Sequence, residues 1–252
     1  MRYFIEFGYK GSAYHGWQKQ NNALGVQEVL EGALSKILRT SIEVTGSSRT
    51  DTGVHATQQF AHFDLPEGTQ LVPSLLYRIN SLLPEDIAVR HLHLVAPELN
   101  SRFVATYRRY EYRITRVKNP FQVQLSHELT AELDIGLMNE AAALLLGTHD
   151  FESFSKVHTN VNNFRCSISR AEWVMAGDIL IFHIQANRFL RGMVRAVVGT
   201  LLEIGRGKRP VSELRDIVEA RNRKYAGPQA PAQGLFLVEV GYPEGIFLET
   251  IS

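Results

Sequence analysis

Several short segments of the chain alternate between hydrophobic and polar residues, a pattern that predicts β-strands. The alternation is clearest over residues 2–7, 87–95, 107–116 and 179–186. Extended structure is also expected over residues 42–44, 54–65, 168–174 and 235–240. The small and polar residues 176–178 separate two of these segments, which favours a hairpin.

Between these strands, apolar residues recur every three or four positions, as in amphipathic helices. Over residues 25–39 they form a stripe that contains Val26, Leu30 and Leu34 and leaves Glu31 and Lys36 outside it. The same spacing predicts helices over residues 74–83, 135–146, 189–204 and 212–220. Both halves of the chain therefore run, in loose fashion, strand, helix, strand, strand, helix, strand.

This order of elements favours an α+β fold with two ferredoxin-like halves. Antiparallel hairpins would join the halves into one continuous, mainly antiparallel sheet with helices on one side. A parallel doubly wound sheet fits less well, because residues 168–186 have the pattern of a hairpin. We place the boundary in the turn at residues 97–100, which gives an N-terminal half of residues 1–98 and a C-terminal half of residues 99–252.

Composition limits the classes of protein to consider. The 252 residues are 44% hydrophobic and 21% charged, as in globular proteins. Apolar runs are all shorter than the roughly 20 residues of a membrane span, and the N-terminus has the pattern of a strand where a secretory signal would have an apolar block. The single cysteine, Cys166, cannot form an intrachain disulfide, which fits a reducing compartment. We expect a cytoplasmic protein without membrane association.

The distribution of charge is more informative than the net charge of +1. Residues 102–118 and 188–209 each carry six basic side chains and one acid. A fold that brought these segments together would have a positive face suited to phosphates. Two separate solvated surfaces explain the charge equally well.

A loop of small residues at 46–56 surrounds Arg49 and Asp51. A neighbouring guanidinium would keep the Asp51 carboxylate ionised, so that it could act as a nucleophile or a base. The simpler interpretation is that Asp51 closes an Asx-turn before Gly53. On the loop alone, the simpler interpretation is favoured.

Two further segments could contact a nucleic acid. Along residues 108–113 arginines alternate with Tyr110 and Tyr112, which offers rings for base stacking beside cations for phosphates. A sheet with one aromatic core face would have the same pattern. In the predicted helix over residues 189–204 and just before it, Arg188, Arg191 and Arg195 would share one face without acids.

Other chemistry has little support. The glycines near the N-terminus do not have the spacing of a nucleotide-binding fingerprint. The histidines, His55 near Asp51 among them, are not accompanied by Cys, Asp or Glu at metal-ligand spacing. We therefore expect neither a cofactor nor a metal.

Taken together, the motifs resemble the tRNA pseudouridine synthase A family. Residues 48–56, SRTDTGVHA, are similar to the catalytic motif of that family, with Ser48 in place of the usual glycine and Thr52 in place of the usual alanine. Five other segments match the family in order: YKGSAYHGWQKQ, RRYEY, DFESF, MVR and GLFLV. The resemblance covers nearly the whole chain.

The resemblance implies a site and an activity. The catalytic residues would be Asp51, Tyr110 and Arg195: Asp51 as the catalytic aspartate, Tyr110 packing on the target base, and Arg195 pairing with Asp51. The residues that bind substrate would be Arg49, Tyr110, Arg109, Arg188 and Leu235. The enzyme would be a homodimer with an RNA-binding cleft on the helix-free side of its sheet. It would isomerise uridine to pseudouridine at nucleotides 38, 39 and 40 of the tRNA anticodon stem-loop, without a cofactor or metal.

Two alternatives stay open on the sequence. The basic segments could belong to a non-catalytic RNA-binding or RNA-folding module. Asp51 and His55 could instead serve a hydrolase of small molecules, although no nucleophile motif supports this.

Overall fold

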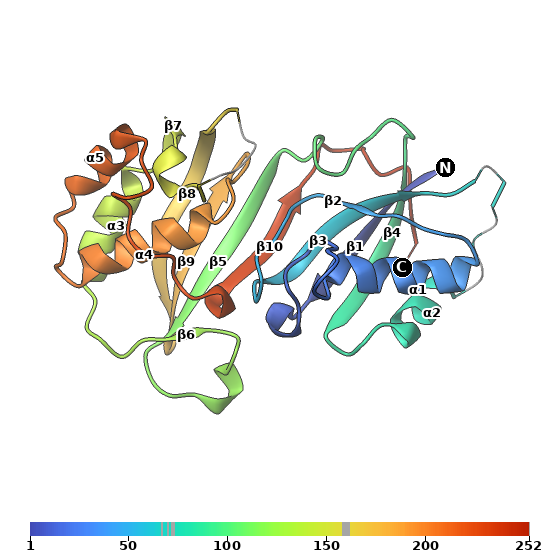
Figure 1. Ribbon diagram of the computed structural model, residues 1–252, viewed down its shortest axis with the longest axis horizontal. Helices are drawn as coiled ribbons and strands as arrows, with labels where there is room; N and C mark the ends of the chain where they lie inside the picture. Colours follow the sequence, from blue (N-terminus) through green and yellow to red (C-terminus); the bar gives the residue numbers. More distant parts are fainter. Residues whose placement is uncertain (67, 70, 72–73, 158–161, 252) are drawn as a thin grey trace. The chain divides into compact units, whose positions relative to one another are not determined.

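The computed structural model describes residues 1–66, 68–69, 71, 74–157 and 162–251. The chain divides into two compact units, which we describe separately. Unit 1 comprises residues 1–106 and 237–252, and unit 2 comprises residues 107–236. Each unit combines α-helices with a mainly antiparallel sheet (Figure 1), which confirms the predicted α+β class. None of the helices in the described part of the chain has the length and hydropathy needed to cross a bilayer.

The sheet of unit 1 is antiparallel, with the strand order β11-β4-β1-β3 and with β2 paired to β3. Its elements are β1 (Arg2–Tyr9), α1 (Val26–Leu38), β2 (Thr45–Gly46), β3 (His55–Asp64), α2 (Leu75–Leu82), β4 (Ile87–Val95) and β11 (Glu249–Ile251). The run from β1 to β4 is strand, helix, strand, strand, helix, strand, as predicted for a ferredoxin-like fold. Helices α1 and α2 lie beside each other (Figure 1).

Both faces of the unit 1 sheet carry buried apolar residues. On one face Tyr3 stacks on Phe63, with ring centroids 5.9 Å apart. On the other face the rings of Tyr242 and Phe247 lie beside the ring of Phe4, with centroids 5.5 and 6.3 Å away. The C-terminal segment of the chain is therefore part of the core of unit 1.

The sheet of unit 2 has the strand order β5-β9-β8-β7, all antiparallel, with a short parallel pair between β5 and β6. Its elements are β5 (Tyr107–Thr115), β6 (His127–Glu128), α3 (Ile135–Ala143), β7 (Gly147–Asp150), β8 (Arg165–Ala176), β9 (Ile179–Ala186), α4 (Met193–Gly205) and α5 (Glu213–Ala220). The boundary between the units falls within β10 (Leu235–Gly241). Ala176 pairs with Ile179 around Gly177, whose φ is 59°, so the predicted hairpin is confirmed.

The prediction of a strand at residues 42–44 is wrong, because side chains of α1 bind this backbone. Ser35 Oγ accepts from the Ile42 N–H at 2.9 Å, and Glu31 Oε1 accepts from the Val44 N–H at 3.0 Å. Glu31, expected outside the apolar stripe, is accordingly buried. The strand β2 begins only at Thr45.

Two predicted helices are shorter in the structure. Helix α3 ends at Ala143, and Gly147, with φ of 95°, then starts β7. Helix α4 begins at Met193, because Gly192 before it has φ of 71°, a left-handed conformation that cannot lie inside an α-helix. Apolar residues at 189 and 190 extend the helical spacing beyond the actual start of the helix.

Candidate active site

Asp51 is half-buried on the loop of unit 1 that connects β2 to β3. The start of this loop is bonded to β3. The Ser47 N–H donates to Phe60 O at 2.7 Å, and the Gln59 side chain accepts from Ser47 Oγ at 3.1 Å and donates to Ser48 O at 2.8 Å. The loop therefore leaves the sheet in a fixed direction.

The N-terminal loop of unit 1 holds the backbone on both sides of Asp51. Before it, Thr50 O accepts from the Trp17 N–H at 3.2 Å, and Thr50 Oγ1 is hydrogen-bonded to Tyr9 Oη at 2.8 Å. After it, the Gly53 N–H donates to Tyr14 O at 3.3 Å. We call residues 9–17, which make these contacts, the N-terminal brace.

Two glycines allow the N-terminal brace to approach the Asp51 loop. A Cβ on Gly11 would lie 2.0 Å from Val54 O, and one on Gly16 would lie 2.5 Å from Thr50 O. Gly16 also has φ of 88°, which other residues rarely adopt. Both glycines lie in the segment YKGSAYHGWQKQ, which resembles the family, but the sequence gives no sign that they pack against the Asp51 loop.

His55 has a structural contact that weakens the hydrolase alternative. Its side chain is buried, and Nδ1 accepts from the Gly11 N–H at 3.0 Å. In the neutral ring the proton is therefore on Nε2. Because Nδ1 already binds the N-terminal brace, we interpret His55 as a residue that holds the loop.

The two departures from the family motif have different surroundings on this loop. The backbone turns at Gly53, which has φ of 77°, and Thr52 beside it is exposed, so its larger side chain extends into solvent. The Ser48 hydroxyl is buried and has no hydrogen-bond partner among the described residues. Arg49 is exposed on the same loop as Asp51.

In unit 2, Tyr110 lies on β5 opposite Ile184 of β9. Its side chain is 6% exposed, and its ring is edge-on to Phe189, with centroids 5.2 Å apart. The neighbouring Arg108 is buried and donates to Asn187 O at 3.0 Å. This hydrogen bond ties β5 to the segment that leads to α4.

The predicted shared helix face of three arginines is wrong. Because α4 begins at Met193, Arg188 and Arg191 lie in the preceding loop and only Arg195 lies on the helix. Arg188 is half-buried, and Arg191 is exposed. The basic character of the segment is retained, but a loop presents two of the three charges.

Arg195 is held by a segment that the sequence analysis did not single out. Its Nε donates to Ala230 O at 2.7 Å, and the Ala230 N–H donates back to Arg195 O at 3.0 Å. Residues 226–231, which we call the strap, run along α4. The Gly227 N–H donates to Thr200 Oγ1 at 2.9 Å, and a Cβ on Gly199 would lie only 1.7 Å from the carbonyl oxygen of the strap residue 228.

The strap is also bonded to β5. Tyr112 is fully buried, and its hydroxyl donates to Pro231 O at 2.9 Å. Burial raises the pKa of Tyr112 well above its usual range. Leu235, buried at the start of β10, follows Gly234, where a Cβ would lie 2.8 Å from the Tyr112 ring. The strap and Leu235 thus pack on the strand that carries Tyr110.

The predicted site residues fall into two sets. Asp51 and Arg49 share one loop of unit 1. The residues on or near β5 and α4 belong to unit 2, and they are Tyr110, Arg109, Arg188, Arg195 and Leu235. Among the residues that the structure describes, no group of three or more His, Cys, Asp and Glu side chains is placed to hold a metal ion.

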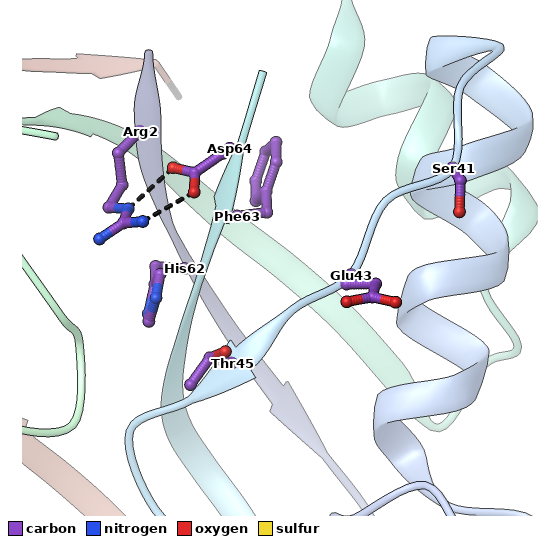
Figure 2. A pocket seen from close by; sticks show the side chains of 7 residues that line it. All are labelled: Arg2, Ser41, Glu43, Thr45, His62, Phe63 and Asp64. Carbon is purple, nitrogen blue, oxygen red and sulfur yellow. Dashed lines mark hydrogen bonds and ion pairs between the residues drawn. The ribbon is translucent and has the colours of Figure 1, made fainter. Parts of the chain in front are cut away.

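A hollow of about 510 Å³ elsewhere in unit 1 has different chemistry (Figure 2). Arg2 donates to both oxygens of Asp64, at 2.8 and 2.7 Å. His62 Nδ1 is hydrogen-bonded to Ser101 Oγ at 2.9 Å, and burial, with the Arg2 charge nearby, lowers the pKa of His62. Because Arg2 and Asp64 neutralise each other, this hollow is a weaker candidate for a phosphate-binding site than the basic segments of unit 2.

Comparison with known proteins identifies the family. The sequence model of the family described as tRNA pseudouridine synthase matches residues 7–103 and 141–243. The chain is 50% identical over 249 residues to a tRNA pseudouridine synthase A of Bacteroides fragilis, which covers 98% of both chains. It is 47% identical over 246 residues to one of Parabacteroides distasonis, again 98% of both. One of Colwellia psychrerythraea is 41% identical over 251 residues, 98% of this chain and 96% of that one.

These matches span nearly the whole chain, and the Asp51 loop with its brace lies inside the first matched range. The chain belongs to the tRNA pseudouridine synthase A family.

Proposed function

We propose that this protein converts uridine to pseudouridine at nucleotides 38, 39 and 40 in the anticodon stem-loop of tRNA. Its family makes it an isomerase that acts on tRNA. The observation that carries the proposed chemistry is the loop at residues 48–56, which is similar to the catalytic motif of the family and is held by backbone contacts on both sides of Asp51. The choice of nucleotides follows from the resemblance to the family. We also propose that the enzyme is a cytoplasmic homodimer and needs neither a cofactor nor a metal.

The reaction requires little more than a positioned carboxylate. The bond between ribose C1′ and N1 of the base breaks, the base turns, and C1′ bonds to C5. C5 loses a proton and N1 gains one, so that the product is an isomer of the substrate and no oxidant, reductant or co-substrate is consumed. Asp51 would act as an anion on C1′, on C6 of the base or on the C2′ proton. Its half-buried position on a braced loop supports any of the three roles, because hydrogen bonds already restrict the loop before the substrate binds.

The residues of unit 2 would bind the extruded nucleotide. Removing a base from its stack costs a few kcal/mol, and the ring of Tyr110 would offset part of that cost by packing on the base. Arg109 and Arg188, which are half-buried, would bind phosphates, and Arg49 and Leu235 would complete the pocket. Arg195 would pair with Asp51 and keep it ionised. Within unit 2, its bond to Ala230 restrains the guanidinium.

The test uses tRNA whose uracil carries tritium at C5. The wild type should release the label and Asp51→Ala should release none, because the reacting carboxylate is lost. Thr52→Ala is the matched control: it changes the next, exposed residue to the one usual in the family and should keep full activity. Label release by Asp51→Ala at the wild-type rate would refute the proposal.

The position of the reaction is tested with three tRNA transcripts. Each has uridine at only one of the nucleotides 38, 39 and 40 and cytidine at the other two. We expect pseudouridine in all three products when they are mapped chemically. A product modified only outside this window would restrict the conclusion to the family activity on tRNA.

A further inference from the structure

Residues 116–125 of unit 2, which we call the β5–β6 arm, present exposed apolar side chains from an ordered loop. Phe121 is 84% exposed, Val123 64% and Val117 52%. The segment leaves the end of β5, turns through a short 3₁₀ helix (Pro120–Gln122) and returns beside β5 as β6 (Figure 1). Contiguous exposed apolar residues on a globular protein commonly mark a binding surface.

The arm keeps its shape through its own hydrogen bonds. The Asn119 side chain accepts from the Phe121 N–H at 2.9 Å, and the Leu125 N–H donates to Gln122 O at 2.9 Å. At its base, Ser126 Oγ is hydrogen-bonded to Thr115 Oγ1 at 3.0 Å. The Phe121 ring is therefore displayed to solvent by a structured loop, so that little ordering entropy is lost on binding.

The charge of the arm decides between two occupants. It contains Arg116 and Lys118 and no acidic residue. A second copy of the chain, bound across a twofold axis through this surface, would place the same cations near each other. An RNA would instead match the cations with phosphates and the exposed ring with a base. Nη1 of Arg116 is buried and has no hydrogen-bond partner among the described residues.

We propose that the β5–β6 arm binds tRNA at nucleotides away from the one that reacts. Phe121 stacks on an unpaired base, and Lys118 with Arg116 binds the neighbouring phosphates. Six residues of an extended strand separate Tyr110 from Arg116, which is about 20 Å, so the arm contacts another part of the RNA than the base at Tyr110. The inference rests on the proposed function for the identity of the ligand and extends it to a second surface.

The test measures equilibrium binding of full-length tRNA by the whole protein over a range of salt concentrations. Phe121→Ala should weaken binding about fivefold or more, the loss of one stacked base. Lys118→Gln should reduce the slope of log K against log salt by about 0.7 to 0.9, the loss of one phosphate contact. At saturating tRNA the rate of label release should be unchanged in both variants, because neither touches the reacting nucleotide.

Matched controls come from unit 1. Tyr77→Ala removes a ring that is 75% exposed on α2, and Lys36→Gln removes an exposed cation on α1. Both should bind tRNA like the wild type. All four positions are exposed, so circular dichroism and thermal unfolding should show folded proteins throughout.

Two results would overturn the proposal: wild-type binding by Phe121→Ala and Lys118→Gln, or conversion of a dimer to monomers by Phe121→Ala with tRNA affinity retained. The second result would make the arm an interface between copies. The proposed function is judged separately by label release. If the wild type releases no label but the arm variants still weaken tRNA binding, the proposal that the arm binds tRNA is supported and the proposed reaction is refuted.

Discussion

The Asp51 loop and the segment around Arg195 are fixed by different kinds of contact. In unit 1 the backbone of the N-terminal brace bonds to the backbone on both sides of Asp51, at distances that only glycine at positions 11 and 16 permits. In unit 2 the side chain of Arg195 bonds to the strap, and the Tyr112 side chain holds the strap to β5.

The difference determines which substitutions each region tolerates. A loop held through its backbone can carry different small side chains, and Ser48 and Thr52 here replace the residues usual in the family. The glycines that pack against the loop cannot be replaced in this way, because a Cβ on them would overlap its backbone. A guanidinium held through its own Nε depends on the identity of that side chain. The predictions below test this contrast, from the largest expected effect to the smallest.

Gly16→Ala should lower the rate of pseudouridine formation by about 100-fold or more, because a shift of roughly 1 Å in a reacting group has that effect. The new Cβ would meet Thr50 O at 2.5 Å and displace the backbone next to Asp51. Gly32→Ala on α1, where a Cβ has no described atom within 4 Å, is the control and should be fully active. Normal activity of Gly16→Ala would show that backbone contact does not position the loop.

Arg195→Lys should lower the rate of pseudouridine formation by about 10- to 100-fold, which corresponds to the free energy of one hydrogen bond from a charged donor. The charge is kept, but a lysine ammonium cannot reproduce the bond from Nε to Ala230 with the same orientation. Arg191→Lys, an exposed arginine in the preceding loop, should change the rate little. Equal rates for Arg195→Lys and the wild type would mean that charge alone is sufficient at this position.

Tyr112→Phe should lower the free energy of unfolding by about 1 to 2 kcal/mol, because Pro231 O would lose its buried donor. Urea unfolding measures this change. The exposed Tyr225→Phe is the control and should have the stability of the wild type. If Tyr112→Phe were equally stable, the strap would be held by its contacts with α4 alone.

The smallest expected effect concerns His62, whose side chain helps to hold the start of β2, the strand that precedes the Asp51 loop. Ser101 links His62 Nδ1 to Thr45 O at the start of β2. Burial, and then the Arg2 charge, lower the pKa of His62 in the folded protein. The neutral His62 side chain therefore makes its full contribution to the stability of the folded protein above the pKa of the unfolded state, about 6.5. This contribution is lost as the pH falls toward the pKa of His62 in the folded state.

Thermal unfolding between pH 7.5 and 5 tests this dependence. The Tm of the wild type should exceed that of His62→Asn by less at pH 5 than at pH 7.5. His15→Asn, at an exposed position, should follow the wild type at each pH. A Tm difference that is constant over this range would contradict the prediction.

Regular elements were predictable where packing follows the repeat of the backbone. Alternation alone predicts β4 and β9 with the bounds that the structure has. The start of α4 was predicted too early, because the spacing of apolar residues does not reveal the left-handed conformation of Gly192. The segment at residues 42–44 was misassigned because the polar residues Glu31 and Ser35 of the preceding helix bind its backbone, and alternation along the segment itself does not reveal such contacts.

The site was predictable only as a set of motifs. Residues 48–56 identify the Asp51 loop, and residues 9–20 match the family as well. Hydrogen bonds between backbone atoms have no pattern in the sequence, so the contacts that join the two segments were missed. The strap was missed for a related reason: residues 226–231 are rich in proline, glycine and alanine and show no periodicity. Their importance comes from contacts with α4 and β5, which only the folded chain provides.

The discontinuous sequence of unit 1 has a consequence for translation. Unit 2 lies wholly within residues 107–236, whereas unit 1 needs residues 237–252. Tyr242 and Phe247 pack against the rings of Phe4 and Phe60, so these contacts form only after the ribosome has added residue 247. A nascent chain that stalls before residue 242 would leave these rings uncovered, a condition that attracts chaperones or leads to aggregation.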